Sequence, residues 1–162
     1  MADDALLMLC HQIRRDTLRI LSAVDDDCLL FAPEGTSNHV LWHCGHAVWL
    51  QDVLCLQLLG HESRLPADWA SIYGMNCEPV AARTNWPTRD EMTNALTKQY
   101  DELVTAITAA SPDDLQRVAD PNRGPLTVCA RIIHGFHDEA RHAGEMCLLA
   151  KLHRAGQADG HE

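Results

Sequence analysis

The chain has 162 residues, of which 46% are hydrophobic and 22% are charged. These values are typical of one globular domain and exclude a disordered chain. Thirteen basic and 23 acidic side chains give a net charge of −10, so we expect neither nucleic acid nor a membrane surface as a partner. No leader pattern opens the sequence, and no apolar run reaches the roughly 20 residues of a spanning helix, so we expect a protein that is neither exported nor membrane-bound.

The seven cysteines favour a cytoplasmic location. None belongs to a Cys-x-x-Cys pair, and several lie in apolar periodic stretches, where cysteine behaves as a small hydrophobic residue. We therefore expect all of them to be reduced.

Two amphipathic helices are predicted in the first 60 residues. The first spans about residues 3–24, where buried positions recur at gaps of three and four: Leu6, Leu9, Ile13, Thr17, Ile20 and Val24. An acidic run with Pro33 and Gly35 then breaks the pattern. Ser37 or Asn38 is expected to cap the second helix, which extends to about residue 59 and stops at Gly60.

A long loop is expected over residues 60–87, because it contains three prolines and a glycine and shows no sustained periodicity. We predict one helical turn near Trp69 and a role for this loop as a cover over a site. Of the four tryptophans, which are otherwise expected in the core, Trp69 is the best pocket candidate.

The third helix begins at a capping box, Thr88 to Glu91, and ends at Ser111 and Pro112. A polar linker leads to a fourth helix, with Pro125 in its first turn and its end near residue 154. Four long helices without alternating strands predict an all-α four-helix bundle over residues 1–155, followed by a flexible polar tail at 156–162.

Six of the ten histidines fall in two windows, one on the second helix and one on the fourth. His39, His43 and His46 share a helical face with Leu50 and Val53 in the first window. The second window contains His134, His137 and His142, together with two acidic residues, Asp138 and Glu145. The remaining histidines, at 11, 61, 153 and 161, are expected to be solvated.

Asp138 and His142 lie four residues apart, so both can reach one ion, and an imidazole from the second helix would complete a three-ligand site. His43 and His46 are the alternatives for that imidazole, whereas His137 is rotated off the stripe. The competing interpretation makes these histidines surface or core residues, with Asp138 paired to Arg141 or Arg131. Gly135 and Gly144 should each cost about 1 kcal/mol inside a helix, which suggests close helix approach.

The two histidine windows resemble motifs of the DinB/YfiT-like superfamily. The segment Asn38-His-Val-Leu-Trp-His-Cys-Gly-His46 is similar to the pattern NHxxWxxGH, and His137-Asp-Glu-Ala-Arg-His-Ala-Gly-Glu145 is similar to the closing pattern HDEAxHxGE. The resemblance implies a four-helix bundle whose metal ligands are His46, Asp138 and His142. Many members have histidine where this chain has Asp138, while relatives that resemble mycothiol-dependent maleylpyruvate isomerases have a carboxylate.

The resemblance also implies a class of function. Family members include thiol-dependent S-transferases, isomerases and metal-dependent hydrolases. The first hypothesis is therefore a metal-dependent enzyme that holds Zn²⁺, or alternatively Ni, Fe or Mn, and activates a low-molecular-weight thiol or water for attack on a small-molecule substrate. His43, His137 and Glu145 are candidates to orient the ligands or move protons.

Three arginines, Arg83, Arg131 and Arg141, are candidates to bind carboxylates of a thiol cofactor. The second hypothesis is a non-catalytic module that senses or stores a metal, or that binds a partner as a homodimer. A structural bundle without metal is the third.

Overall fold

The computed structural model describes residues 4–36, 38–75, 77 and 84–159. Its long helices are α1 (Asp4–Ala23), α2 (Val40–Gln51), α4 (Arg89–Ala109) and α6 (Val128–Asp159). The shorter elements are η1 (Asp26–Cys28), η2 (Asp52–Leu56), α3 (Trp69–Tyr73), α5 (Pro112–Gln116) and η4 (Pro121–Arg123). The part of the chain that is described contains no β-strand, so the prediction of an all-α fold is confirmed.

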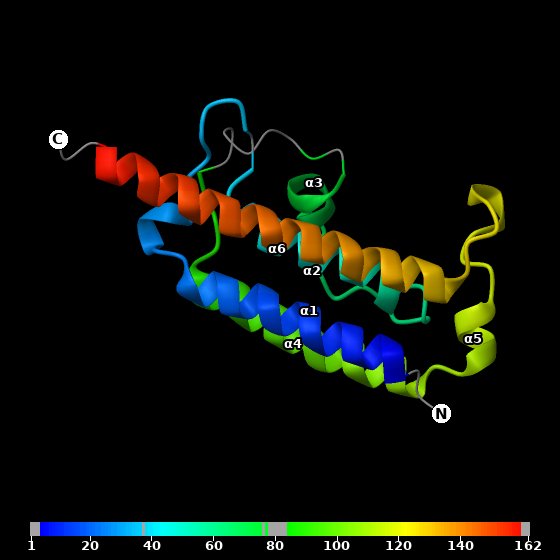
Figure 1. The fold of residues 1–162 in the computed structure, drawn as a ribbon. Helices are drawn as coiled ribbons and strands as arrows, with labels where there is room; N and C mark the ends of the chain where they lie inside the picture. Colours follow the sequence, from blue (N-terminus) through cyan, green and yellow to red (C-terminus); the bar gives the residue numbers. More distant parts are fainter. Residues whose placement is uncertain (1–3, 37, 76, 78–83, 160–162) are drawn as a thin grey trace.

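The four long helices form a bundle in which α1 lies beside α4 and α2 lies beside α6 (Figure 1). Contacts between α1 and α6 and between α2 and α4 join the two pairs. The short helix α3 lies against α2. No described helix has both the length and the apolar character that crossing a bilayer requires.

Two apolar clusters fill the bundle, and a buried polar network separates them. One cluster contains Ile20, Val48, Leu96 and Ala143, from α1, α2, α4 and α6. The other contains Ile13, Cys55, Leu103 and Phe136, from α1, η2, α4 and α6. Each long helix contributes a polar side chain between the two clusters: Arg14 and Thr17, Gln51, Gln99, and Glu139. Polar groups at this depth require hydrogen-bond partners, and this network supplies them.

The N-cap of helix α2 differs from the predicted residue. The cap is His39, whose ring Nδ1 accepts the backbone N–H of Trp42. The prediction of Asn38 as the cap is wrong, and Ser37 lies outside the described residues. An imidazole acceptor takes the place of the usual hydroxyl or carboxylate because His39 is buried beside Trp86, with ring centroids 4.2 Å apart.

A π-helical segment, η2, follows α2 without a break. A π-turn holds one residue more than an α-turn, so it rotates the side chains that follow it. Val53 is only half-buried, while Cys55 and Leu56 are buried. That Val53 shares the face of His46 stays a prediction. The helix ends at Leu56, three residues before the predicted end, and turn residues lead from it to Gly60, which has a φ of +87°.

The connection from residue 60 to residue 87 contains the predicted helical turn, α3. The capping box at Thr88 is confirmed, since its side chain accepts the N–H of Glu91 and the Glu91 carboxylate accepts the N–H of Thr88. A second capping box, formed by Ser111 and Asp114, begins α5 shortly after the end of α4. This short helix was not predicted, because the linker sequence is polar and shows no apolar periodicity.

The last helix, α6, begins at Val128, so the placement of Pro125 in its first turn is wrong. Backbone bonds from Ala119 to Leu126 and from Val128 to Arg117 hold the preceding residues extended. The helix runs to Asp159, so residues 156–159 are helical where a flexible tail was predicted. A hydrogen bond of 2.8 Å from Gln157 to Asp27 fastens this end; residues 160–162 lie outside the described part.

The two glycines of α6 differ. A Cβ at Gly135 would lie 3.1 Å from the Gln51 side-chain oxygen, so the predicted close approach of helices is confirmed there. A Cβ at Gly144 would meet nothing within 4 Å, so no neighbouring helix requires that glycine and the same prediction is wrong.

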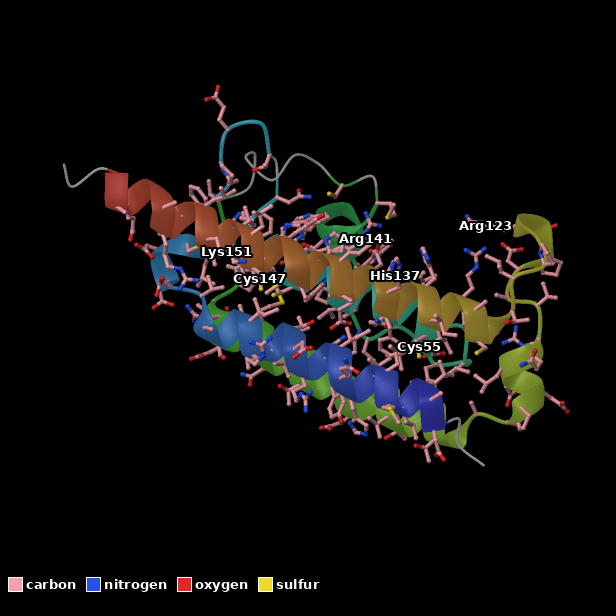
Figure 2. The ribbon with its side chains drawn as sticks, in the orientation of Figure 1. Cys55, Arg123, His137, Arg141, Cys147 and Lys151 are labelled. Carbon is pink, nitrogen blue, oxygen red and sulfur yellow. The ribbon has the colours of Figure 1, made fainter. Side chains whose placement is uncertain are left out.

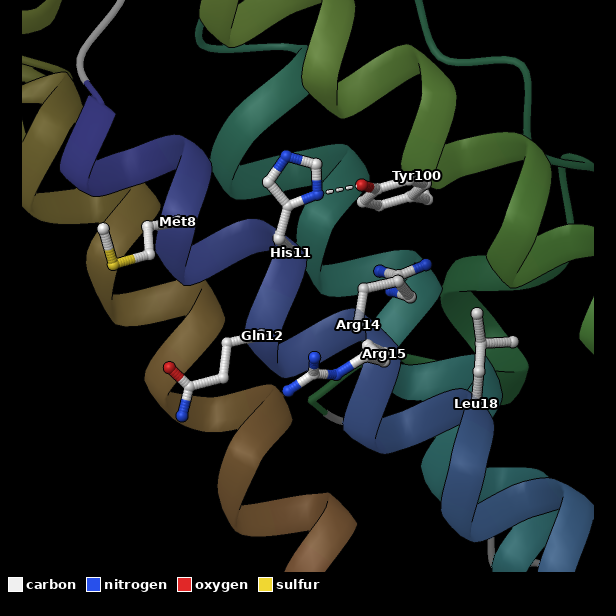
Figure 3. A pocket seen from close by; sticks show the side chains of 7 residues that line it. All are labelled: Met8, His11, Gln12, Arg14, Arg15, Leu18 and Tyr100. Atoms are coloured by element: carbon white, nitrogen blue, oxygen red, sulfur yellow. Dashed lines mark hydrogen bonds between the residues drawn. The ribbon is translucent and has the colours of Figure 1, made fainter.

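The isolated histidines are not all solvated. His11 is exposed but its Nδ1 bonds the Tyr100 hydroxyl, at the edge of a groove of about 640 Å³ between α1 and α4 that Met8, Arg15 and Leu18 also line (Figure 3). His153 is half-buried and lies edge-on to Phe31. His61 is exposed, as expected, and residue 161 is outside the described part.

Candidate metal centre

Helix α2 positions two buried imidazoles toward α6. His43 and His46 are three residues apart, so they project from one face, and His46 is only 2% exposed. The helix can bury this face because almost every α2 side chain is apolar and it packs between α3, α4 and α6. Burial, followed by the positive charge of neighbouring histidines, lowers the pKa of His43 to about 3, so this ring is neutral near pH 7.

Helix α6 supplies the opposing groups. Asp138 and His142 are separated by one helical turn, and each side chain is 16% exposed. Their partners on α2 are buried, so the cluster opens to solvent beside α6. The ring nitrogen Nε2 of His142 lies 3.3 Å from Asp138 Oδ2.

His46, Asp138 and His142 form a group that can hold a metal ion, with one ligand atom of each within 4.8 Å of the others. His46 Nε2 is 3.4 Å from Asp138 Oδ2. Ligands about 2.0–2.1 Å from a tetrahedral zinc ion stand roughly 3.3 Å apart, so these separations suit such an ion. The three residues predicted from the sequence as ligands are therefore brought together, while their role as ligands stays a prediction.

The hydrogen bonding of His46 tests whether a cation fits. His46 Nδ1 lies 2.6 Å from the carbonyl oxygen of Tyr73, which can only accept, so Nδ1 carries the proton and donates it. In the neutral ring Nε2 is then a bare acceptor, and it faces the Asp138 carboxylate, which also accepts. Burial lowers the pKa of His46 and disfavours a second proton on the ring. A metal ion between these acceptors satisfies them all.

A second group that can hold a metal shares His142 with the first. It consists of His43, His142 and Glu145. His142 Nδ1 is 2.7 Å from His43 Nδ1 and 3.3 Å from Glu145 Oε2, and His43 Nδ1 is 3.2 Å from the same oxygen. Glu145 and His43 thus contact His142 directly, in the places expected of residues that orient a ligand.

Aromatic rings enclose the α2 side of the cluster. Trp42 stacks on His46 with ring centroids 4.9 Å apart and planes 16° apart, and Trp49 lies against the same imidazole. Trp42 Nε1 donates to the carbonyl of Ile72, and Trp69 Nε1 donates to that of Gly45. These bonds attach α3 to α2, so part of the 60–87 connection covers the site, as predicted.

Two of the histidines in the sequence motifs lie elsewhere. His134 and His137 are exposed and belong to neither metal-binding group, so His137 does not contact the ligands it was a candidate to orient. Figure 2 labels His137 and Arg141 on α6. Arg141 is 66% exposed and 3.5 Å from Asp138, so the ion pair of the competing interpretation exists but is a weak, solvated one.

The candidate arginines lie at different distances from the cluster. Arg141 is beside the cluster, whereas Arg131 is half-buried nearly two turns before Asp138. Arg83 lies outside the described residues. Of the three, Arg141 is therefore placed to meet a ligand at the open side of the site.

Sequence reasoning missed two parts of the site. The Tyr73 carbonyl is a backbone group, so no residue type signals it. Gly45 had a signal, since a glycine inside a helix is costly and requires a reason. That reason is Tyr73, whose ring lies so close to Gly45 that a Cβ there would overlap it. The helix α3 can thereby bring its carbonyl to His46.

The chain is thus a helical bundle with a His/Asp cluster that could hold a metal ion and that opens to solvent beside α6. A model of the DinB superfamily matches residues 9–146, so the chain belongs to the DinB superfamily. The family and the cluster together indicate a divalent metal.

Solved structures agree on the fold. The chain is similar to a conserved protein from Enterococcus faecalis, with a TM-score of 0.70 and 15% sequence identity over 94% of this chain and 97% of the other. At that identity the likeness shows the fold alone. Among curated proteins no match is found.

Proposed function

We propose that the protein is a divalent-metal-dependent enzyme that uses His46, Asp138 and His142 as ligands and catalyses thiol transfer to a small electrophile or a related hydrolysis. Zn²⁺ is the ion that this set of two nitrogens and one oxygen suits best, with Ni, Fe or Mn as alternatives. The cytoplasm, where low-molecular-weight thiols are abundant, is the proposed location.

One observation carries the proposal: His46 Nε2 and Asp138 Oδ2, both acceptors, lie 3.4 Å apart at a position where burial disfavours a proton. The Tyr73 carbonyl fixes the imidazole so that its lone pair points at Asp138. In the buried network around Glu139, by contrast, both carboxylate oxygens accept from donors, whereas the donor near Asp138 is the exposed Arg141, which lies 3.5 Å from the other oxygen, Oδ1.

The chain's own residues would divide the remaining work. A bound ion with three protein ligands supplies Lewis-acid chemistry at its open position, where it lowers the pKa of a thiol or water. Trp42 and Trp49 exclude solvent from the α2 side of the cluster, so a substrate approaches beside α6. Arg141, exposed at that edge, can pair with a carboxylate of the incoming thiol or electrophile.

Proton transfer is assigned to Glu145. It contacts His142 Nδ1 and is 50% exposed, so it can pass a proton that leaves the thiol or water to solvent. His43 also contacts His142 Nδ1, but burial lowers its pKa to about 3, so it is a weak base and its role is to orient the His142 ring.

The first experiment measures metal per chain in untagged protein by elemental analysis, for the wild type, His46→Ala and His142→Ala. His134→Ala is the matched control, because His134 is an exposed histidine of the same helix as His142. We expect wild type and control to retain metal and the two ligand variants to lose nearly all of it. Equal metal in all four proteins would refute the site.

A second experiment separates the enzyme from a non-catalytic metal-binding or dimeric module. The metal-loaded protein is screened with low-molecular-weight thiols and electrophiles, and with small ester and amide substrates. We expect turnover that His142→Ala abolishes and His134→Ala preserves, with both variants folded by circular dichroism. Turnover that survives His142→Ala would rule out the proposed chemistry, and metal binding without turnover would favour the module.

A further inference from the structure

Each of the two ring nitrogens of His142 faces a different set of polar groups. Its Nε2 faces Asp138 at 3.3 Å and belongs to the group that includes His46. Its Nδ1 faces His43 Nδ1 at 2.7 Å and Glu145 Oε2 at 3.3 Å. A neutral imidazole carries one proton, so it can donate in only one of these two directions.

We propose that His43, His142 and Glu145 form a second divalent-cation site, and that the His142 ring bridges it to the site at His46 and Asp138. This inference rests on the metal centre of the proposed function and adds a second ion to it. The chemical class is a borderline cation that favours nitrogen with one oxygen, such as Zn²⁺ or Cu²⁺.

The geometry of the second group resembles one face of a coordination tetrahedron. The two nitrogen–oxygen separations, 3.2 and 3.3 Å, are close to the roughly 3.3 Å between ligands of a tetrahedral zinc ion, whereas the two nitrogens, 2.7 Å apart, would have to separate by about 0.6 Å on binding. The atoms come from two helices, and two of the three are imidazole nitrogens rather than carboxylates. The cluster therefore differs from a patch of acidic surface.

The two sites should differ in affinity. The first is made of a buried imidazole and two side chains that are 16% exposed, whereas Glu145 is 50% exposed. Water competes more strongly for a ligand that is free to move, so the second ion should bind more weakly. The exposed Glu145 also gives this ion a direct path of entry.

The proton balance of the bridge is simple. When Nε2 of His142 binds the first ion, the remaining ring proton is on Nδ1. Binding of the second ion replaces that proton, which is released to solvent, and the ring becomes an imidazolate shared by two cations. In the alternative, Nδ1–H remains and donates to His43 or Glu145, and the chain holds a single ion at this cluster.

The test titrates metal-depleted, untagged protein with Zn²⁺ against a competing chelator, and then with Cu²⁺. Glu145→Gln keeps the size of the side chain and removes its charge, and Glu62→Gln, an exposed carboxylate in the loop after Gly60, is the matched control. The variant His134→Gln/His137→Gln removes exposed histidines of α6 that bind copper adventitiously. We expect two equivalents in the wild type and both controls, and one in Glu145→Gln.

Electron paramagnetic resonance of the Cu²⁺ protein supplies a second readout. Two Cu²⁺ ions on one imidazolate couple magnetically, so the integrated signal of the wild type should fall well below its copper content. In Glu145→Gln, and in His43→Gln as a second variant, the signal should equal the copper content. A wild-type signal equal to its copper content, or two equivalents in Glu145→Gln, would overturn the bridge.

The outcomes separate this inference from the proposed function. One equivalent in both the wild type and Glu145→Gln would refute the second site while leaving the first intact. No retained metal in the wild type would refute both.

Discussion

Two neighbouring carboxylates of α6, Glu139 and Asp138, differ in burial and in the groups that surround them. Glu139 is fully buried and receives hydrogen bonds from Arg14, Thr17 and Gln51, at 2.9 to 3.1 Å. Asp138, one residue earlier, faces the ring nitrogens of His46 and His142 at 3.3 to 3.4 Å and is partly exposed. Both oxygens of Glu139 are opposed by donors, whereas Asp138 Oδ2 lies opposite the Nε2 acceptor of His46 and Asp138 Oδ1 meets only the exposed Arg141, at 3.5 Å.

The difference distinguishes a structural polar cluster from one that is built for a ligand. In the network of Glu139, the guanidinium of Arg14 also donates to Gln99 and to the Leu96 carbonyl, so charge and hydrogen bonds are balanced within the protein. In the cluster of Asp138, a cation between His46 Nε2 and Asp138 Oδ2 would balance these two acceptors. Burial and charge are present in both, so the pairing of donors with acceptors is the informative property.

The largest expected effect comes from Glu139→Gln. The change leaves the charge of Arg14 buried without its partner, and breaking such a pair costs about 3–5 kcal/mol. We expect the free energy of unfolding in urea to fall by about that amount in metal-free protein. Glu145→Gln, at a half-exposed carboxylate, is the control and should change it by less than about 1 kcal/mol. Equal losses would mean that the network is not the structural centre of the bundle.

Asp138→Asn should give the reverse pattern. The metal-free protein should keep its stability, because Asp138 is partly exposed and its ion pair with Arg141 is solvated. Its affinity for Zn²⁺ should fall by at least about tenfold, by analogy with the loss of a group that supports a metal. Chelator competition measures the affinity and urea unfolding the stability; a large loss of stability with unchanged affinity would remove the contrast with Glu139.

Gly45→Ala should weaken both fold and site. The added methyl group meets the Tyr73 ring, and overpacking of this kind costs about 1–3 kcal/mol. Displacement of Tyr73 also withdraws its carbonyl from His46, so the affinity for Zn²⁺ should fall together with the melting temperature. Gly144→Ala is the matched control in α6: nothing lies within 4 Å, so it should be neutral or stabilise by up to about 1 kcal/mol.

A further expected effect is a pH dependence that comes from His39 and develops only as the pH falls below neutrality. Burial lowers its pKa from 6.5 to about 4, so the unfolded chain binds a proton more readily than the folded one between these values. The contribution of His39 to stability is therefore complete above about pH 6.5 and is lost as the pH falls toward 4. In metal-free protein, His39→Asn keeps a residue suited to the N-cap and should flatten the fall in melting temperature over this range. An unchanged slope would place the titration elsewhere.

The sequence predicts the four long helices because their buried stripes and the capping box at Thr88 are local signals. Helical spacing also places Asp138 and His142 together, but it leaves His43 and His46 as alternatives on α2, and only the resemblance to the family motif selects His46. The sequence does not predict the Tyr73 carbonyl, which depends on how α3 folds back on α2. It also misses the pairing of Arg14 with Glu139, since residues 125 positions apart carry no joint pattern.

The π-turn at η2 determines how the side chains after it are rotated relative to those of α2. Before the turn, α2 directs His43, His46 and Val48 toward the half of the bundle that contains the candidate metal centre. After it, Cys55 and Leu56 belong to the other apolar cluster. In a continuous α-helix the side chains of both halves would follow one repeating direction. The extra residue of the π-turn rotates the second half, so that its side chains can point in a different direction. The π-helical segment thus changes the direction of the side chains between the half of the bundle that contains the candidate metal centre and the other half, which is an apolar core.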